Sequence, residues 1–295
     1  MYTFGGFMND VILAFGDSIT QFGQNPDLNG WVMQLTNRYM RKLDVINRGF
    51  SGYNTSNGKI VLSKILPESS TESLTEKRIQ LPASGSFKNR VKQEISAKTG
   101  STLRLVLIFL GANDAISTDS QQYVSLEDYK DNLKSMIDLI KEPNSKNYSP
   151  LSNILLISPP PISECMWEKE LLNFGVSLNK SNSLTKKYAQ VTVEVGKEKK
   201  IPTIDLWNIF MDDISYSRSL KFGTPQLDNI EAQNFEDASY GFKDLLIDGL
   251  HLSKTGNDRL FELVVEKISE CFPDINADNI DRILPNCNSI LSFTE

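Results

Sequence analysis

Short apolar runs alternate along this chain with longer segments in which apolar residues recur every three or four positions. The runs are rich in Val, Ile, Leu and Phe and mostly end at Gly, Asn, Ser or Pro, which is typical of buried strands that stop at a turn. The pattern predicts five strands, at residues Val11–Phe15, Asp44–Asn47, Leu103–Leu110, Asn153–Ser158 and Ile201–Leu206. The unbroken run at residues 103–110 is typical of a central strand that is covered on both faces.

The intervening segments have the period of amphipathic helices. Helices are predicted at residues Trp31–Lys42, Ser56–Leu66, Leu126–Ile140, Leu178–Lys199 and Gly256–Cys271, and residues 207–211 begin another. Pro67 and Pro143 end two of them, because proline cannot continue a helix. Strands that alternate with helices predict an α/β fold whose parallel sheet is covered on both faces.

Two polar stretches interrupt this pattern. Residues 67–102 are dense in Ser, Thr, Lys and Glu, and such a composition buries too little apolar surface to offset the entropy of the chain. We therefore expect an exposed, partly disordered insertion with a short helix near residues 88–96, a lid over a cleft being the alternative. Residues 212–242 form a second polar insertion, and residues 21–30 form a polar loop after the first strand.

We expect a single domain over residues 1–295, with its core at about residues 11–271. Residues 272–295 are predicted to be a C-terminal tail. A short apolar patch in this tail, Ile280–Leu284, either docks on the body of the domain or on a second subunit, so a homodimer is one of the open alternatives.

Composition and charge exclude several classes of function. The formal net charge is −6 and the basic residues are scattered, so we expect no nucleic-acid partner. No apolar stretch approaches the roughly 18 residues of a membrane span and no signal-like segment precedes Val11, so we expect a cytoplasmic protein. Three widely spaced cysteines and one histidine predict neither a disulfide framework nor a metal site.

The first predicted strand delivers a serine hydroxyl to its carboxyl end, where open α/β sheets place their chemistry. Ser18 needs a neighbouring base to become a nucleophile, and His251 is the only histidine in the chain. Asp248 lies three residues before it and can hold the imidazole in one tautomer. Ser18, Asp248 and His251 therefore form a candidate catalytic triad.

Two further motifs follow other predicted strands. Gly52 permits a positive φ, so that its N–H can point into a cleft, and the Asn113 side chain can donate to a developing oxyanion. Taken singly, each motif also fits an ordinary turn or capping sequence, as Ser18 alone fits a helix cap. Their occurrence together with the candidate triad favours the catalytic interpretation.

In chain order these motifs resemble the four blocks of the SGNH hydrolases of the GDSL type. The matching segments are Gly-Asp-Ser-Ile at residues 16–19, the Gly52 turn, Gly-Ala-Asn-Asp at residues 111–114 and Asp-Gly-Leu-His at residues 248–251. Within that family, Asn-Arg-Gly-Phe-Ser-Gly-Tyr at residues 47–53 is most similar to the isoamyl acetate-hydrolysing esterase branch.

The resemblance implies the flavodoxin-like three-layer α/β/α fold of these hydrolases, with a five-stranded parallel sheet. It implies that Ser18 is the nucleophile, His251 its base and Asp248 the residue that orients the base. It also implies an oxyanion hole of the Ser18 N–H, the Gly52 N–H and the Asn113 side chain. A carboxylic ester hydrolase in lipid metabolism is the implied function, acting without a cofactor on small-molecule short-chain acyl esters such as acetates.

Further residues stand beside these motifs. Three prolines at residues 159–161 predict a rigid rim, and the resemblance implies that Pro160, Ile162 and Trp167 contact the substrate. Plain loop packing is the alternative for Trp167. Asp17 and Asp114 adjoin motif positions, and we expect them to hydrogen-bond to the loops and not to take part in catalysis.

Functions of two other kinds fit the same residues. A lipase, a thioesterase or an acyltransferase would use the same triad and differ in the acyl chain or the acceptor. A non-catalytic binding protein on this fold is the alternative from another class. Loss of function on such a fold normally removes one of the motif residues, and none is missing here.

Overall fold

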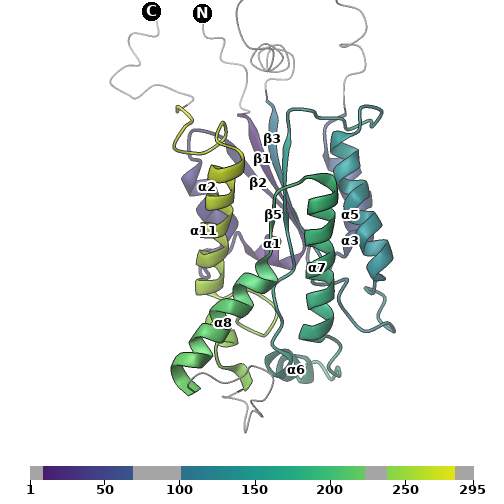
Figure 1. Ribbon diagram of the computed structural model, residues 1–295, viewed down its shortest axis with the longest axis vertical. Helices are drawn as coiled ribbons and strands as arrows, with labels where there is room; N and C mark the ends of the chain where they lie inside the picture. The colour runs from purple at the N-terminus through teal and green to yellow at the C-terminus, as the bar shows by residue number, and fades with distance from the viewer. Residues whose placement is uncertain (1–8, 69–100, 223–237, 283–295) are drawn as a thin grey trace, which may run out of the picture.

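The computed structural model describes residues 9–68, 101–222 and 238–282 (Figure 1). Its five strands pair in parallel in the order β2-β1-β3-β4-β5. The strands are Val11–Gly16 (β1), Asp44–Gly49 (β2), Leu103–Phe109 (β3), Asn153–Ile157 (β4) and Thr203–Ile204 (β5). This is the flavodoxin-like strand order, so the predicted fold class is confirmed.

Each strand supplies side chains to both faces of the sheet, because successive residues of a strand point in opposite directions. In β1, Ile12 and Ala14 belong to one buried cluster, whereas Leu13 and Phe15 belong to the other. Both clusters must be covered, which explains why the strands read as unbroken apolar runs.

Three helices lie on each side of the sheet (Figure 1). One side holds α2 (Trp31–Arg38), α8 (Leu206–Phe222) and α11 (Lys254–Cys271), and the other holds α3 (Thr55–Ile65), α5 (Leu126–Lys141) and α7 (Asn182–Lys199). Three shorter helices complete the described part of the chain: α1 (Ser18–Phe22), α6 (Glu164–Leu172) and α10 (Phe242–Leu245). The three-layer α/β/α architecture is therefore confirmed.

The chain order of the strands places a topological switch point between β1 and β3. β1 pairs with β2 on one side and with β3 on the other, so that Gly16 stands opposite both Gly49 and Phe109. The connections after β1 and β3 leave in opposite directions, which is the arrangement that opens a binding crevice at the carboxyl ends of the strands. The segments that contain Ser18 and Asn113 both start at this crevice.

Several predicted boundaries shift for local reasons. The helix predicted from Leu178 begins at Asn182, because the side chain of Ser181 accepts a hydrogen bond from the Leu184 N–H and caps it there. The strand predicted at residues 201–206 is only Thr203–Ile204, an edge strand with a single neighbour. The helix predicted at residues 31–42 ends at Arg38, and the strand predicted at residues 44–47 continues to Gly49.

The prediction that residues 212–242 form a polar insertion is partly wrong. Its first residues continue α8 as far as Phe222, and residues 242–245 form α10. Leu206, Phe210 and Ile214 recur at a spacing of four and are buried in the core. This single apolar stripe is enough to hold the helix on the sheet, although most of the surrounding residues are polar. In the same way, the loop predicted at residues 21–30 begins only after α1.

The segment after α11, predicted to be a C-terminal tail with a docking patch, packs on the core from its first residues. Phe272, Ile275 and Ala277 are buried in the core, and Ile280 packs against it. The Tyr39 hydroxyl donates a 2.8 Å hydrogen bond to the Ile275 carbonyl. Of the two docking sites considered for the apolar patch, Ile280 therefore uses the body of the domain, whereas Leu284 lies outside the described residues.

Most of the insertion predicted at residues 67–102, including the short helix predicted near residues 88–96, lies outside the described residues. The single-domain organisation stays a prediction. In the described ranges, the helices are either too short or too polar to cross a lipid bilayer.

We expect Ile275→Ala to lower the free energy of unfolding by about 2–4 kcal/mol, because it removes a fully buried side chain and leaves a cavity. Ile60→Ala is the matched control, since Ile60 is 61 % exposed on α3, and it should change stability by less than about 0.5 kcal/mol. Chemical denaturation of both variants checks this. Equal small effects would show that the segment after α11 does not contribute to the core.

Candidate active site

Ser18 is positioned by a tight turn between β1 and α1. Asp17 caps the helix, its Oδ1 accepting a 2.9 Å hydrogen bond from the Ile19 N–H, and Ser18 is the first helical residue. A side chain at Gly16 would lie 2.4 Å from the Phe109 carbonyl oxygen, so only glycine permits this close approach to β3. The sequence therefore places the Ser18 hydroxyl at the crevice.

His251 stands on a closed loop before α11. Leu246 and Leu252 form an antiparallel bridge, and the Ile247 N–H donates to the His251 carbonyl at 2.9 Å. Inside the loop, Asp248 Oδ1 accepts from the Leu250 N–H at 2.9 Å and from the His251 N–H at 2.8 Å. These contacts fix the orientation of the Asp248 carboxylate, and its Oδ2 is directed at the imidazole.

The loop is seated against the start of α6. The Ser163 N–H donates to the Gly249 carbonyl at 2.9 Å, and Gly249 has a φ of +97°. A Cβ at Gly249 would lie 2.6 Å from both the Ser163 carbonyl oxygen and the Trp167 nitrogen. Glycine is therefore required here for its backbone conformation and for the close packing.

The three residues of the candidate triad form one chain of hydrogen bonds. His251 Nδ1 lies 2.6 Å from Asp248 Oδ2, and His251 Nε2 lies 2.9 Å from Ser18 Oγ. Burial raises the pKa of Asp248, but its hydrogen bonds with His251 and with the backbone outweigh burial and lower the pKa below its ordinary value. The carboxylate is therefore ionised at neutral pH, which favours the imidazole tautomer with its proton on Nδ1.

The Gly52 turn and the Asn113 loop meet beside this chain. The Phe50 N–H donates to the Gly16 carbonyl at 2.9 Å, which places the turn next to the end of β1. Asn113 Nδ2 donates to the Tyr53 carbonyl at 2.9 Å, and Gly52 has a φ of +81°. An amide nitrogen carries two hydrogens, so Asn113 keeps a second donor.

Asp114 ties the Asn113 loop to Thr55, the first residue of α3. It is fully buried, and its Oδ1 accepts from the Thr55 N–H at 2.9 Å and from Thr55 Oγ1 at 2.5 Å. Burial raises the pKa of Asp114 to about 6, although the hydrogen bonds from Thr55 oppose the shift. The prediction that Asp17 and Asp114 hydrogen-bond to the motif loops is confirmed.

Two aromatic rings flank the imidazole. The ring centroid of Phe22 lies 5.2 Å from that of His251, and the ring centroid of Trp167 lies 6.4 Å away, both edge-on. Phe22 is 40 % exposed, so its ring presents apolar surface beside the imidazole. The sequence argument named Trp167 but missed Phe22, which could have been found from its place four residues after Ser18, one helical turn away.

Pro160 and Ile162 are both buried. Ile162 is 1 % exposed and belongs to the core cluster that also contains Leu250. Its backbone N–H donates to Asn182 Oδ1 at 3.2 Å. Contact of these two residues with a substrate stays a prediction.

Sequence reasoning also missed Lys180. Its side chain is 6 % exposed, and its Nζ donates a 2.5 Å hydrogen bond to the carbonyl of Ala112. A lysine in a polar stretch before a helix gives no signal of burial, so only the packing of the loops reveals it.

Comparison with known proteins shows the family of the chain. The profile of the GDSL-like Lipase/Acylhydrolase family matches residues 12–264, which is most of the chain. The chain belongs to this family. It is therefore a GDSL esterase or acylhydrolase, and the resemblance seen in its sequence is confirmed.

Relatives of this GDSL hydrolase cover nearly its whole length. It is 32% identical to the human "Isoamyl acetate-hydrolyzing esterase 1 homolog" over 88% of this chain and 82% of the relative. It is 26% identical to the Saccharomyces cerevisiae "Isoamyl acetate-hydrolyzing esterase", over 96% and 95% of the two chains. A lipase/acylhydrolase from Enterococcus faecalis shares the fold, with a TM-score of 0.50 and 22% identity over 94% of this chain and all of the other.

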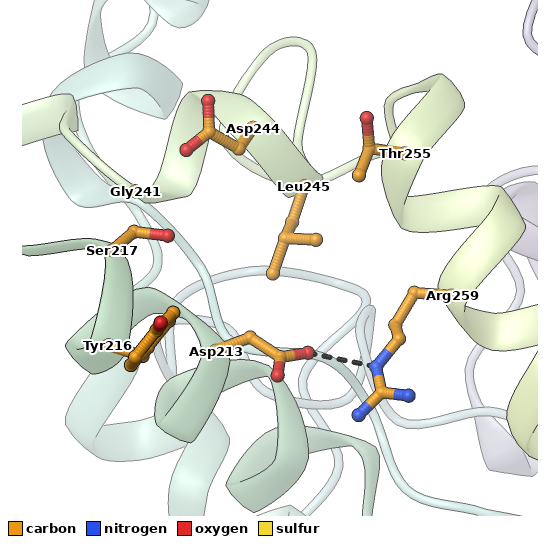
Figure 2. Close-up of a pocket in the computed structure, with 8 residues that line it drawn as sticks. All are labelled: Asp213, Tyr216, Ser217, Gly241, Asp244, Leu245, Thr255 and Arg259. Carbon is orange, nitrogen blue, oxygen red and sulfur yellow. Dashed lines mark hydrogen bonds and ion pairs between the residues drawn. The ribbon is translucent and has the colours of Figure 1, made fainter.

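A separate cavity of about 270 Å³ lies between α8, α10 and α11 of the GDSL hydrolase. Figure 2 shows Asp213 and Arg259 facing one another across it, joined by a 3.0 Å ion pair. None of the candidate triad residues lines this cavity. Within the described residues, no group of three or more His, Cys, Asp and Glu side chains is placed to hold a metal ion.

The GDSL hydrolase buries the Asp17 carboxyl completely, and burial raises its pKa from 3.8 to about 7 despite the Ile19 hydrogen bond and the nearby His251. The folded protein therefore holds this proton more tightly than the unfolded chain. Stability contributed by the raised pKa is present below pH 3.8 and is lost as the pH rises through about 7.

We expect Asp17→Asn to raise the free energy of unfolding at pH 8 by at least about 1 kcal/mol, because asparagine keeps the cap acceptor without the buried charge. The gain should shrink as the pH falls toward 4. Denaturation at several pH values checks this against Asp131→Asn on the exposed face of α5, which should change stability by less than about 0.5 kcal/mol. A less stable Asp17→Asn variant at pH 8 would contradict the sign.

Proposed function

We propose that this GDSL hydrolase cleaves short-chain acyl esters such as acetates, with Ser18, His251 and Asp248 as its catalytic triad. The observation that carries this proposal is the hydrogen-bonded chain from Asp248 through the only imidazole of the protein to Ser18. The names of the human and yeast relatives, which refer to isoamyl acetate, support acetate esters as the substrate class.

In this reaction Ser18 Oγ attacks the carbonyl carbon of the ester while His251 Nε2 takes its proton. The tetrahedral intermediate collapses to an acyl-enzyme, and the imidazolium gives the proton to the departing alcohol. Water then repeats the sequence and releases the carboxylic acid. Asp248 stabilises the imidazolium through both steps and stays ionised.

The negative charge on the former carbonyl oxygen needs donors that are already in place. We assign this role to the Ser18 N–H, the Gly52 N–H and the Asn113 side chain. The hydrogen bond from Asn113 to the Tyr53 carbonyl supports the assignment, since it holds the amide rigid and leaves one of its hydrogens for the oxyanion.

The surroundings of His251 favour an apolar alcohol group. The rings of Phe22 and Trp167 both contact the imidazole, which in the proposed reaction protonates the leaving alcohol. Ile247, next to Asp248, is 49 % exposed and adds apolar surface to the same loop. An alkyl group that leaves from this side would therefore contact hydrocarbon and not charged groups.

We expect the purified protein to hydrolyse alkyl acetates, and Ser18→Ala to lower kcat by at least about 10⁴-fold because no other hydroxyl replaces the nucleophile. A serine-directed phosphonate should label Ser18 in the wild type and fail to label His251→Ala. Ser135→Ala, at an exposed position on α5, is the control and should keep full activity.

The outcomes separate the alternative functions. Faster turnover of long-chain esters or thioesters would favour a lipase or thioesterase, and product esters formed in the presence of an added alcohol would favour an acyltransferase. Full activity of Ser18→Ala, or labelling at another residue, would overturn the triad. If no acyl donor reacts, the result would favour a non-catalytic binding protein.

We expect Phe22→Ala to lower the preference for isoamyl acetate over methyl acetate, measured as the ratio of kcat/KM, by about 5–30-fold. The substitution removes part of the apolar contact to the alkyl group and should affect the smaller ester less. Phe174→Ala is the control, because Phe174 is 72 % exposed after α6, and it should leave the ratio unchanged. Equal losses on both esters would show that Phe22 does not contact the alcohol.

A further inference from the structure

We propose that Lys180 is a positioning residue that holds the Asn113 amide in place for the oxyanion. The inference deepens the proposed function and rests on it. Lys180 would not touch the substrate, and its whole effect on the reaction would pass through Asn113.

The first observation is the contact between Lys180 and the peptide that precedes Asn113. Lys180 Nζ donates to the carbonyl of Ala112 at 2.5 Å, and this carbonyl belongs to the peptide bond that joins Ala112 to Asn113. Because the peptide unit is planar, a hydrogen bond that fixes the direction of this carbonyl also fixes the peptide plane that contains the Asn113 Cα. A hydrogen bond from a charged donor is also stronger than one from a neutral donor.

The second observation is that the neighbouring residue holds the other end of the same loop. The Ser117 N–H donates to the Asn179 carbonyl at 2.8 Å. Asn179 Oδ1 in turn accepts from Trp167 Nε1 at 3.2 Å. Residues 179–180 therefore connect both ends of the Asn113 loop to the tryptophan that stands beside His251.

The third observation is the charge around Lys180. Asp17 and Asp114 are near enough to interact with it electrostatically, and each is a buried neighbour of a site residue, Ser18 or Asn113. Burial lowers the pKa of Lys180 to about 8, although the two carboxylates oppose the shift. A buried cation is destabilising unless it is compensated, so an apolar side chain of the same length would serve packing better. Packing alone therefore does not explain a lysine here.

A double-mutant cycle on the full-length protein tests the proposal with Lys180→Met, Asn113→Ala and the double variant. Asn113→Ala should lower kcat for an alkyl acetate by about 10²–10³-fold. We expect Lys180→Met alone to lower kcat by about 10–100-fold with KM changed by less than about 3-fold. In the Asn113→Ala background it should cost less than about 2-fold further, because its effect passes through the missing amide.

Two more variants complete the design. Lys187→Met, at an exposed position of α7, makes the same substitution outside the site and should leave kcat unchanged. Lys180→Gln keeps an N–H donor on a side chain one bond shorter, so it should retain more of the wild-type kcat than Lys180→Met does. If Lys180→Met does not fold, Lys180→Gln goes through the same cycle, and any loss it shows should vanish without Asn113.

Additive losses in the double variant would overturn the proposal, as would a Lys180→Met variant with more than half of the wild-type kcat. Amide hydrogen exchange gives a readout that needs no ester: exchange at residues 113–117 should be faster in Lys180→Met and unchanged in Lys187→Met. If the wild type hydrolyses no ester, the proposed function has failed, and the exchange result alone then decides whether Lys180 holds the loop.

Discussion

The contact between Ser18 and His251 joins two segments that lie 233 positions apart in the sequence. It depends on how the helices that follow each residue are fastened together. Asn257, in the first turn of α11, accepts a 3.1 Å hydrogen bond from the Trp31 N–H at the start of α2. Asn29 and Gln34 both hydrogen-bond to Asp258. The hydroxyl and the imidazole therefore meet because one helix from each end of the chain packs against the other.

The sheet also helps to bring the site residues together. Gly16 ends β1 between β2 and β3, and the segments that leave those two strands bring the Gly52 turn and Asn113 to the same edge. The site is thus built from four chain segments around one strand end. Burial raises the pKa of Asp17 and of Asp114 beside these segments, and perturbed pKa values are common at functional sites.

Much of this arrangement could be predicted from local sequence. Ser18, Asn113 and His251 stand in short motifs that bear their own turn chemistry, and the strands are apolar runs that need no partner to be recognised. The burial of Ile214 and Ile275 was not predicted, because each is an apolar residue in a largely polar stretch and its burial depends on a distant surface. Lys180 could not be found, since nothing beside it in the sequence distinguishes it from a solvated lysine.

The seat of Gly249 against α6 has a consequence for how such enzymes diversify. Because the loop backbone touches the start of α6 with no room for a side chain, that helix cannot shift without moving His251 as well. New substrate preferences would therefore arise from replacement of side chains on α6, such as Trp167. Displacing the helix itself would move the His251 ring relative to Ser18, so side chains can vary at this point but the backbone positions cannot.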